Sequence, residues 1–138
     1  MNKSAKKEEA PCMISFEHFI PNDQSPIYQQ IILYIKQGIA AGQIRDGDEM
    51  PSRRVLSALL GVNPNTVQKS YKLLEEAHLI ASTPGAKSCV TVSDAQKAAI
   101  RADLLGTHVR AIVQAMQQMG ADKEEALRLL DALWEETL

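Results

Sequence analysis

The feature that most constrains this chain is a short break at residues 61–64, which separates two stretches with helical periodicity. Before the break, Ser52 is a good N-cap for a short helix whose apolar residues fall on one face. After it, Asn63 can cap a further helix that has Pro64 at its first position and runs to about His78. Two helices joined by a short turn that contains glycine are typical of a helix-turn-helix.

The segments that flank this motif predict a winged helix. Ser25 as a cap and Pro26 at the first position predict a long helix before the motif. Behind the motif, β-prone runs at 79–82 and 89–92 bracket a turn-rich stretch and predict a β-hairpin. We therefore expect a mainly α fold with a small β-hairpin wing, preceded over 13–20 by a short strand or a packed arm.

The sequence after residue 93 has a different pattern. Apolar residues recur there at alternating spacings of four and three, the period of a coiled coil, until Gly120 ends the helix. Asp122 with Glu125 is typical of a helix start and predicts a second, shorter helix. Two such helices cannot bury all their apolar surface within one chain, so residues 94–138 are expected to form a dimerisation region. The residues expected at the dimer contact are Leu105, Val109, Ile112, Met116, Met119, Leu127, Leu130 and Trp134.

Composition excludes several function classes. The 138 residues carry 15 Lys and Arg against 17 Asp and Glu, a net charge of −2, which argues against a protein that coats nucleic acid by bulk charge. One Trp, 3 Tyr and 2 Phe are too few for a surface that stacks single-stranded bases. Cys12 and Cys89 form no Cys-x-x-Cys pair, and no stretch resembles a secretory signal or a membrane span, so we expect a cytoplasmic protein that does not bind membranes.

No constellation of residues predicts catalysis. His18, His78 and His108 lie far apart, and none has a second ligand at the spacing of a metal site. The sequence has no glycine-rich phosphate loop, no Gly-x-Ser-x-Gly and no grouping of a nucleophile with a histidine and an acid. We expect no catalytic residue, no metal and no cofactor, and hence no enzyme.

One face of the third helix carries amides and cations. This stripe consists of Asn65, Gln68, Lys69 and Lys72, with no acid until Glu75. Asn and Gln can pair with two groups of an adenine edge at once, and Lys binds guanine or phosphate. An exposed helix can also be polar for no further reason, but the place of this stripe directly after a helix-turn corner favours contact with double-stranded DNA.

Two arginines, Arg53 and Arg54, follow the N-cap of the second helix, which crosses the DNA backbone in a helix-turn-helix. Adjacent helical residues point about 100° apart, so at most one of them faces the surface of the third helix, and we favour Arg54. The alternative is a solvated Arg54 or one paired with Asp48 or Glu49. Lys87 at the hairpin tip is expected to contact phosphate or the minor groove, with a solvent-exposed loop lysine as the alternative.

Three strings of residues follow one another along the chain. They are Pro26-Ile27-Tyr28-x-Gln30-Ile31, then Pro51-Ser52-x-Arg54-x-Leu56, and then Leu60-Gly61-Val62-Asn63-Pro64-Asn65-Thr66-Val67-Gln68-Lys69-x-Tyr71-x-x-Leu74-Glu75. In this order, over about residues 13–92, the chain resembles the GntR family of bacterial transcription regulators, and most of all its small YtrA-type branch. That branch also carries a short two-helix tail.

The resemblance implies roles for individual residues. Arg54, Asn65, Thr66 and Gln68 would read the operator with Asn63 at the corner, Lys69, Tyr71 and Lys72 would assist at the DNA backbone, and the wing would touch the minor groove. The full set expected at DNA is Ser52, Arg53, Arg54, Asn63, Asn65, Thr66, Gln68, Lys69, Tyr71, Lys72 and Lys87.

The chain departs from the family pattern at two places. His78-Leu79-Ile80 stands where the family usually has Gly-Leu-Ile. Gly85-Ala86-Lys87-Ser88-Cys89 stands where a Gly-x-Gly tip followed by an aromatic is usual, so the depth of the wing in the groove stays open.

These features lead to one expected function. We expect residues 1–12 to form a mobile tail, 13–93 a winged helix-turn-helix DNA-binding domain and 94–138 a two-helix dimerisation region. The chain is then a sequence-specific transcription regulator, a homodimeric repressor that binds a palindromic operator in double-stranded DNA. The alternative function is a winged helix that binds a protein partner without binding DNA. An unidentified small-molecule effector also stays possible, and the thioethers of Met116 and Met119 could line a pocket for it.

Overall fold

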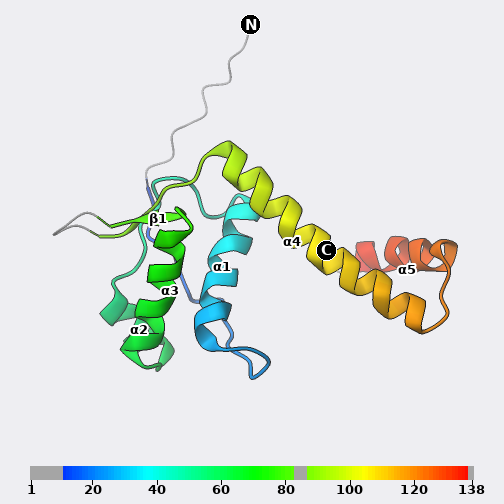
Figure 1. The fold of residues 1–138 in the computed structure, drawn as a ribbon, viewed down its shortest axis with the longest axis horizontal. Coiled ribbons are helices and arrows are strands. Elements are labelled where there is room, and N and C mark those ends of the chain that lie inside the picture. The colour runs from blue at the N-terminus through cyan, green and yellow to red at the C-terminus, as the bar shows by residue number, and fades with distance from the viewer. Residues whose placement is uncertain (1–10, 83–86, 137–138) are drawn as a thin grey trace, which may run out of the picture. The chain divides into compact units, whose positions relative to one another are not determined.

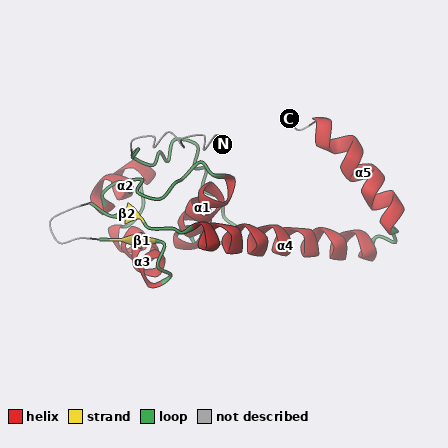
Figure 2. Ribbon diagram, turned by 90° about the horizontal axis from the view of Figure 1, so that it is seen from above, coloured by secondary structure: helices red, strands yellow, loops and turns green. Residues whose placement is uncertain are grey.

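Seven regular elements follow one another in a computed structural model that describes residues 11–82 and 87–136 (Figure 1). Five are helices and two are short strands, so the fold is mainly α, as predicted (Figure 2). The described residues fall into two compact units, one up to Arg101 and one from Ala102. The elements are α1 (Ile27–Ala41), α2 (Arg53–Leu60), α3 (Pro64–Glu76), β1 (Ile80–Ala81), β2 (Cys89–Val90), α4 (Asp94–Gln118) and α5 (Lys123–Glu136).

The helix-turn-helix forms where the sequence predicts it. The Ser52 hydroxyl accepts a hydrogen bond from the Val55 N–H at 3.1 Å and caps α2, and the Asn63 side chain accepts one from the Asn65 N–H at 2.8 Å and caps α3. Between the helices, Gly61 has a φ of 64°, a left-handed conformation that residues with a side chain adopt only at a cost. These local signals explain where both helices begin and where the first one ends.

The start of α1 corrects one expectation. The N-cap is Pro26 rather than Ser25, and α1 has no side-chain cap hydrogen bond. The buried Gln30 side chain reaches back to the preceding loop instead. Its oxygen accepts from the Asn22 N–H at 2.9 Å, and its Nε2 donates to the carbonyls of Asn22 at 2.8 Å and Ser25 at 2.6 Å. Gln30 therefore holds this loop against α1 through backbone groups.

The core of the first unit lies where α1 packs on α3. On α3, Val67, Ser70 and Leu74 are fully buried and form the inward face of the helix. Ala77, at the C-cap of α3, is exposed. This packing fixes the rotation of α3 about its axis and leaves its opposite face in solvent. From α1, the fully buried residues that meet this face are Ile31, Ile35 and Ile39.

The N-terminal segment is a packed arm rather than a regular strand, so one of the two alternatives is confirmed. The Glu49 N–H donates to the Cys12 carbonyl at 2.9 Å. Phe16 is buried, and its ring centroid lies 4.9 Å from that of Tyr34 on α1. The mobile tail expected before this arm falls mostly on residues 1–10, which lie outside the described residues.

An antiparallel hairpin follows α3, as predicted, with Ile80 opposite Val90. Each strand has 2 residues, fewer than the predicted runs. On the other edge of β2, the Met50 N–H donates to the Ser88 carbonyl at 2.8 Å, so the base of the wing is tied to the segment that leads into α2. The predicted wing tip at Gly85 lies outside the described residues.

The second unit contains the later part of α4 and all of α5. Gly120 has a φ of 78° after α4, and the Asp122 carboxylate accepts a hydrogen bond from the Glu125 N–H at 2.9 Å, so both predicted helix signals are confirmed. No described residue between 102 and 136 is buried within the chain. Among the described residues, no helix combines the length and the apolar character needed to cross a membrane.

Candidate nucleic-acid interface

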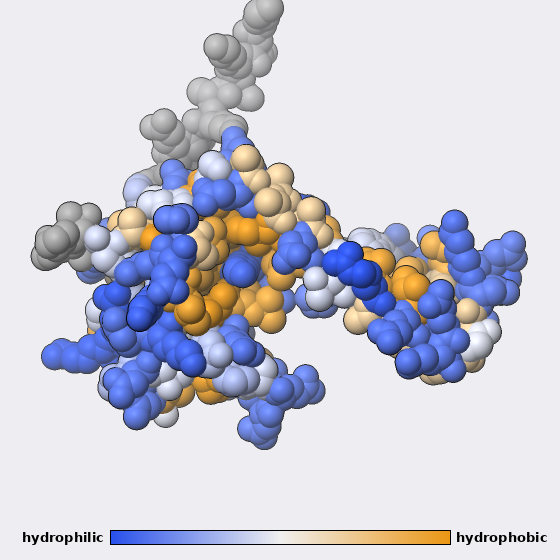
Figure 3. All heavy atoms as spheres, in the orientation of Figure 1, coloured by the Kyte–Doolittle hydropathy of each residue, from blue (hydrophilic) through white to orange (hydrophobic). Residues whose placement is uncertain are grey.

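Hydrophilic side chains gather over α2 and α3 (Figure 3). Opposite the buried face of α3, Asn65, Gln68, Lys69 and Lys72 are all exposed. Within the described part of the chain, the side chains of Asn65, Gln68 and Lys72 have no hydrogen-bond or ion-pair partner. Two amides and one ammonium are therefore available to another molecule along this face.

Lys69 differs from the rest of this stripe. Its Nζ lies 3.9 Å from the centroid of the Tyr28 ring, a cation–π contact. Tyr28 is near the start of α1, and its carbonyl accepts a hydrogen bond from the Ser70 hydroxyl at 3.1 Å. The start of α1 therefore lies beside the exposed face of α3. Tyr28 has no role in the predictions from sequence, although it lies in the first of the three strings that carry the family resemblance.

The residues at the helix-turn corner are partly committed to the fold. Asn63 is exposed, and its side-chain oxygen accepts the bond that caps α3, which leaves its amide N–H groups without a partner among the described residues. Thr66 is half-buried, and its backbone N–H donates to the Asn63 carbonyl at 2.9 Å. Both residues stay candidates, because the hydroxyl of Thr66 and the amide N–H groups of Asn63 have no partner in the described part of the chain.

The two arginines of α2 are placed differently. Arg54 is exposed and has no partner among the residues that the structure describes. Arg53 donates from Nη2 to Glu75 Oε1 at 3.0 Å, and its guanidinium lies 5.1 Å from the centroid of the Tyr71 ring. The guanidinium of Arg53 is therefore held by α3 in the single chain, and its DNA contact stays a prediction. Arg54 is the member of the pair without an internal partner among the described residues.

Tyr71 lies in the core rather than on the exposed face of α3. It is only 1% exposed, so its side chain cannot reach the DNA backbone in this conformation. Its hydroxyl donates to the carbonyl of Pro51, just before α2. Burial raises the pKa of this hydroxyl, and the charge of Arg53 opposes the shift, so the group stays protonated and keeps donating at neutral pH. Tyr71 therefore fixes α3 against the start of α2.

Lys87 is exposed beside β2 and pairs with Glu49, with 3.6 Å between Nζ and Oε2. An exposed pair of this kind contributes about 0–1 kcal/mol, so a phosphate can replace the carboxylate at little cost. The alternative in which Arg54 pairs with Glu49 is wrong, because the Glu49 carboxylate faces Lys87 instead. Lys87 and Arg53 both line a recess of about 240 Å³ between the start of α2 and the wing.

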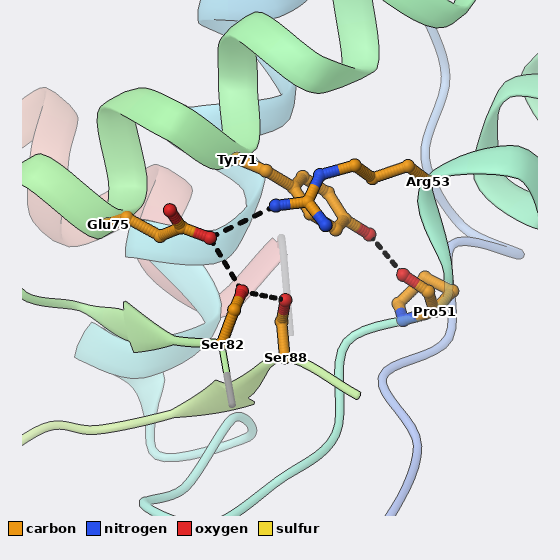
Figure 4. Close-up of polar contacts among 6 residues, drawn as sticks. All are labelled: Pro51, Arg53, Tyr71, Glu75, Ser82 and Ser88. Atoms are coloured by element: carbon orange, nitrogen blue, oxygen red, sulfur yellow. Dashed lines mark hydrogen bonds and ion pairs between the residues drawn. The ribbon is translucent and has the colours of Figure 1, made fainter. Parts of the chain in front are cut away.

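A hydrogen-bonded network joins α2, α3 and the two sides of the wing (Figure 4). The Oε1 atom of Glu75 accepts from Arg53 Nη2 at 3.0 Å and from the Ser82 hydroxyl at 2.6 Å. The hydroxyls of Ser82 and Ser88 lie 2.7 Å apart. No sequence signal predicts this network, because its members come together only through the packing of three elements.

The second unit presents apolar side chains to solvent. Met119 is 79% exposed, and Trp134 is 66% exposed. Met116 is half-buried. Large apolar side chains gathered at a surface mark a contact site with another molecule. The residues predicted for dimerisation and found exposed in the single chain are Leu105, Val109, Ile112, Met119, Leu127, Leu130 and Trp134, and Val113, Leu129 and Leu133 are exposed as well.

Comparison with known sequences and structures gives consistent matches. The family model for bacterial regulatory proteins of the gntR family matches residues 27–90. Over 65 residues the chain is 42% identical to the HTH-type transcriptional repressor YtrA of Bacillus subtilis, a match that covers 47% of this chain and 50% of YtrA. Over 106 residues it is 31% identical to the HTH-type transcriptional regulator YhcF of the same organism, which covers 74% of this chain and 84% of YhcF.

Among solved structures, a GntR family transcriptional regulator from Listeria monocytogenes has a TM-score of 0.74 and 29% sequence identity. That match covers 81% of this chain and 98% of the Listeria chain. The similarity to this structure and to YhcF therefore extends well beyond the helix-turn-helix, whereas the similarity to YtrA spans half of that protein.

Proposed function

We propose that this chain, which belongs to the GntR family of bacterial regulatory proteins, is a DNA-binding regulator of transcription rather than an enzyme. In this proposal it acts in the cytoplasm as a homodimeric repressor of an inverted-repeat operator. Repression is supported by similarity to YtrA, which is named a transcriptional repressor. A repressor of this kind acts by occupying promoter DNA.

The observation that carries the proposal is the unpartnered, exposed face of α3. Asn65 and Gln68 can each bind an adenine edge through two hydrogen bonds, and Lys72 can bind guanine or phosphate. Arg54 at the start of α2 supplies a cation without an internal partner for the adjacent DNA backbone. In this arrangement the amides discriminate between bases, and the cations provide affinity that is independent of sequence.

A second copy of the chain is the proposed partner of α4 and α5. The apolar residues of α4 recur at coiled-coil spacing and are exposed in the single chain, so an equivalent helix can bury them. Each large aliphatic side chain that becomes fully buried contributes about 1.5–3 kcal/mol. Two-fold symmetry of the dimer then requires an inverted repeat whose half-sites lie about 34–36 Å apart.

Selection from a pool of random duplexes, followed by fluorescence anisotropy on the enriched sequence, tests the proposal. We expect an inverted repeat to be enriched and the affinity to fall with salt at a log–log slope of about −5 to −9, as for six to ten neutralised phosphates. Light scattering during size exclusion should give the mass of two chains. Failure to enrich any palindrome would contradict operator binding, and a monomeric mass would contradict the dimer.

A further inference from the structure

We propose that Glu75 is a wing-positioning residue, which holds the base of the wing against α2 and α3 and thereby sets how the wing meets the minor groove. The proposal rests on the operator binding inferred above and adds a specific residue to it. Glu75 acts here through Ser82 and Arg53 and does not itself touch DNA.

The geometry places a single oxygen of Glu75 between two elements. Its Oε1 accepts from Ser82 Oγ at 2.6 Å on the wing side and from Arg53 Nη2 at 3.0 Å on the α2 side. Ser82 follows β1, and its hydroxyl lies 2.7 Å from that of Ser88, which precedes β2 (Figure 4). Both sides of the hairpin are therefore connected to the same carboxylate.

The other end of the network is anchored in the core. The Arg53 guanidinium lies 5.1 Å from the ring centroid of Tyr71, and Tyr71 is almost completely buried. The Tyr71 hydroxyl donates in turn to the Pro51 carbonyl. Hydrogen bonds to an ionised carboxylate are roughly twice as strong as those between neutral groups. Glu75 is consequently held in place on the side of α2 and can restrain the more exposed Ser82.

The wing needs such a restraint because its own pairing is short. β1 and β2 contribute 2 residues each, and a hairpin of this size has little stability of its own. The Met50 N–H bond to the Ser88 carbonyl fixes the second strand from its outer edge. On the side of the first strand, the Ser82 bond to Glu75 links the wing to the helix that carries the proposed base-reading face.

Two variants and a matched control test this role in the full-length protein on its selected operator. Glu75→Ala removes the carboxylate. Ser82→Ala keeps the carboxylate and its bond to Arg53, but removes the hydroxyl that links the carboxylate to the wing and that bonds to Ser88. Glu76→Ala removes the same charge one residue along α3, where Glu76 is exposed and has no partner among the described residues. Cleavage by hydroxyl radicals reports on the minor groove, and methylation of guanine N7 by dimethyl sulfate reports on the major groove.

We expect Glu75→Ala and Ser82→Ala to lose minor-groove protection and to bind the operator about five- to tenfold more weakly, while major-groove protection persists. Glu76→Ala should keep both protections. Unchanged minor-groove protection in Glu75→Ala would overturn the inference, and so would loss of both protections together, because that result indicates damage to α2 and α3. If Glu75→Ala does not fold, as judged by circular dichroism, Ser82→Ala decides. If wild-type protein selects no operator, the proposed function fails rather than this role of Glu75.

Discussion

His78 directly after α3 is the residue at which the backbone of this chain is strained. Its φ is 59°, and it is the single non-glycine residue with positive φ among the described residues. A residue with a Cβ atom is destabilised there by about 1–2 kcal/mol, because Cβ approaches the following carbonyl oxygen. Glycine avoids this contact but loses about 0.5–1 kcal/mol more in conformational entropy on folding. His78→Gly should therefore raise the free energy of unfolding by about 0.75 kcal/mol, the difference between the midpoints of these two ranges.

The histidine side chain offers nothing that offsets this gain. It is exposed, and no described residue bonds to its ring. The His78 carbonyl accepts hydrogen bonds from Thr91 Oγ1 at 3.4 Å and from Gln96 Nε2 at 3.3 Å, and glycine keeps this carbonyl. The substitution thus changes the backbone preference and leaves the neighbouring contacts in place.

The effect is measured by thermal unfolding, with circular dichroism as the signal. All variants are compared at one protein concentration, because the unfolding midpoint of a protein that associates rises with its concentration. A change of 1 kcal/mol shifts the midpoint by about 4–8 °C in a domain of roughly 60–100 residues, so we expect His78→Gly to melt a few degrees higher. His78→Ala is the control, because it removes the imidazole but keeps Cβ. Equal midpoints for the two variants, or a lower midpoint for glycine, would refute the reasoning from backbone strain.

Three further predictions concern packing, base reading and assembly. Gly38→Ala should lower the free energy of unfolding in urea by about 1–3 kcal/mol, because its Cβ would overlap Cδ1 of the buried Ile44. An unchanged midpoint would contradict this expectation. In duplex selection, Gln68→Ala should relax the preference for particular bases. Lys72→Ala should weaken binding to all duplexes alike and reduce the salt slope by about one. An unaltered base preference in Gln68→Ala would show that Gln68 does not contact the bases. Ile112→Glu should give monomers in size exclusion, and a persistent dimer would place the interface elsewhere.

The parts of the fold that the sequence predicts are those decided within a few residues of chain. Ser52 and Asn63 cap helices through the backbone N–H groups that follow them, and Gly61 supplies the left-handed turn, so local rules suffice. The cap expected at Ser25 is absent, and the loop there is held by Gln30 from within α1. Rules for caps consider only the side chain of the cap position and do not anticipate such a contact.

The candidate site shows where local rules end. Tyr71 comes four residues after Val67 and three before Leu74, so periodicity alone places it on the inward face, although the family resemblance implied a DNA contact. Arg53 and Glu75 are 22 positions apart, and their ion pair depends on the rotation of α2 relative to α3. That rotation is set by packing, which the pattern of each helix taken separately does not determine.

The arrangement of charge explains how a chain with a net charge of −2 can bind DNA. Residues 52–90 contain five cations and two acids, so the positive excess is local to the helix-turn-helix and the wing. Arg53 is held by an ion pair and an aromatic ring together, whereas the exposed contacts of Lys69 and Lys87 each contribute about 1 kcal/mol or less. Those two lysines can therefore exchange their internal partners for phosphate, so each chain has four cations that can bind phosphate. Eight such contacts in the proposed dimer correspond to a salt slope of about −7, inside the range expected for the proposed operator.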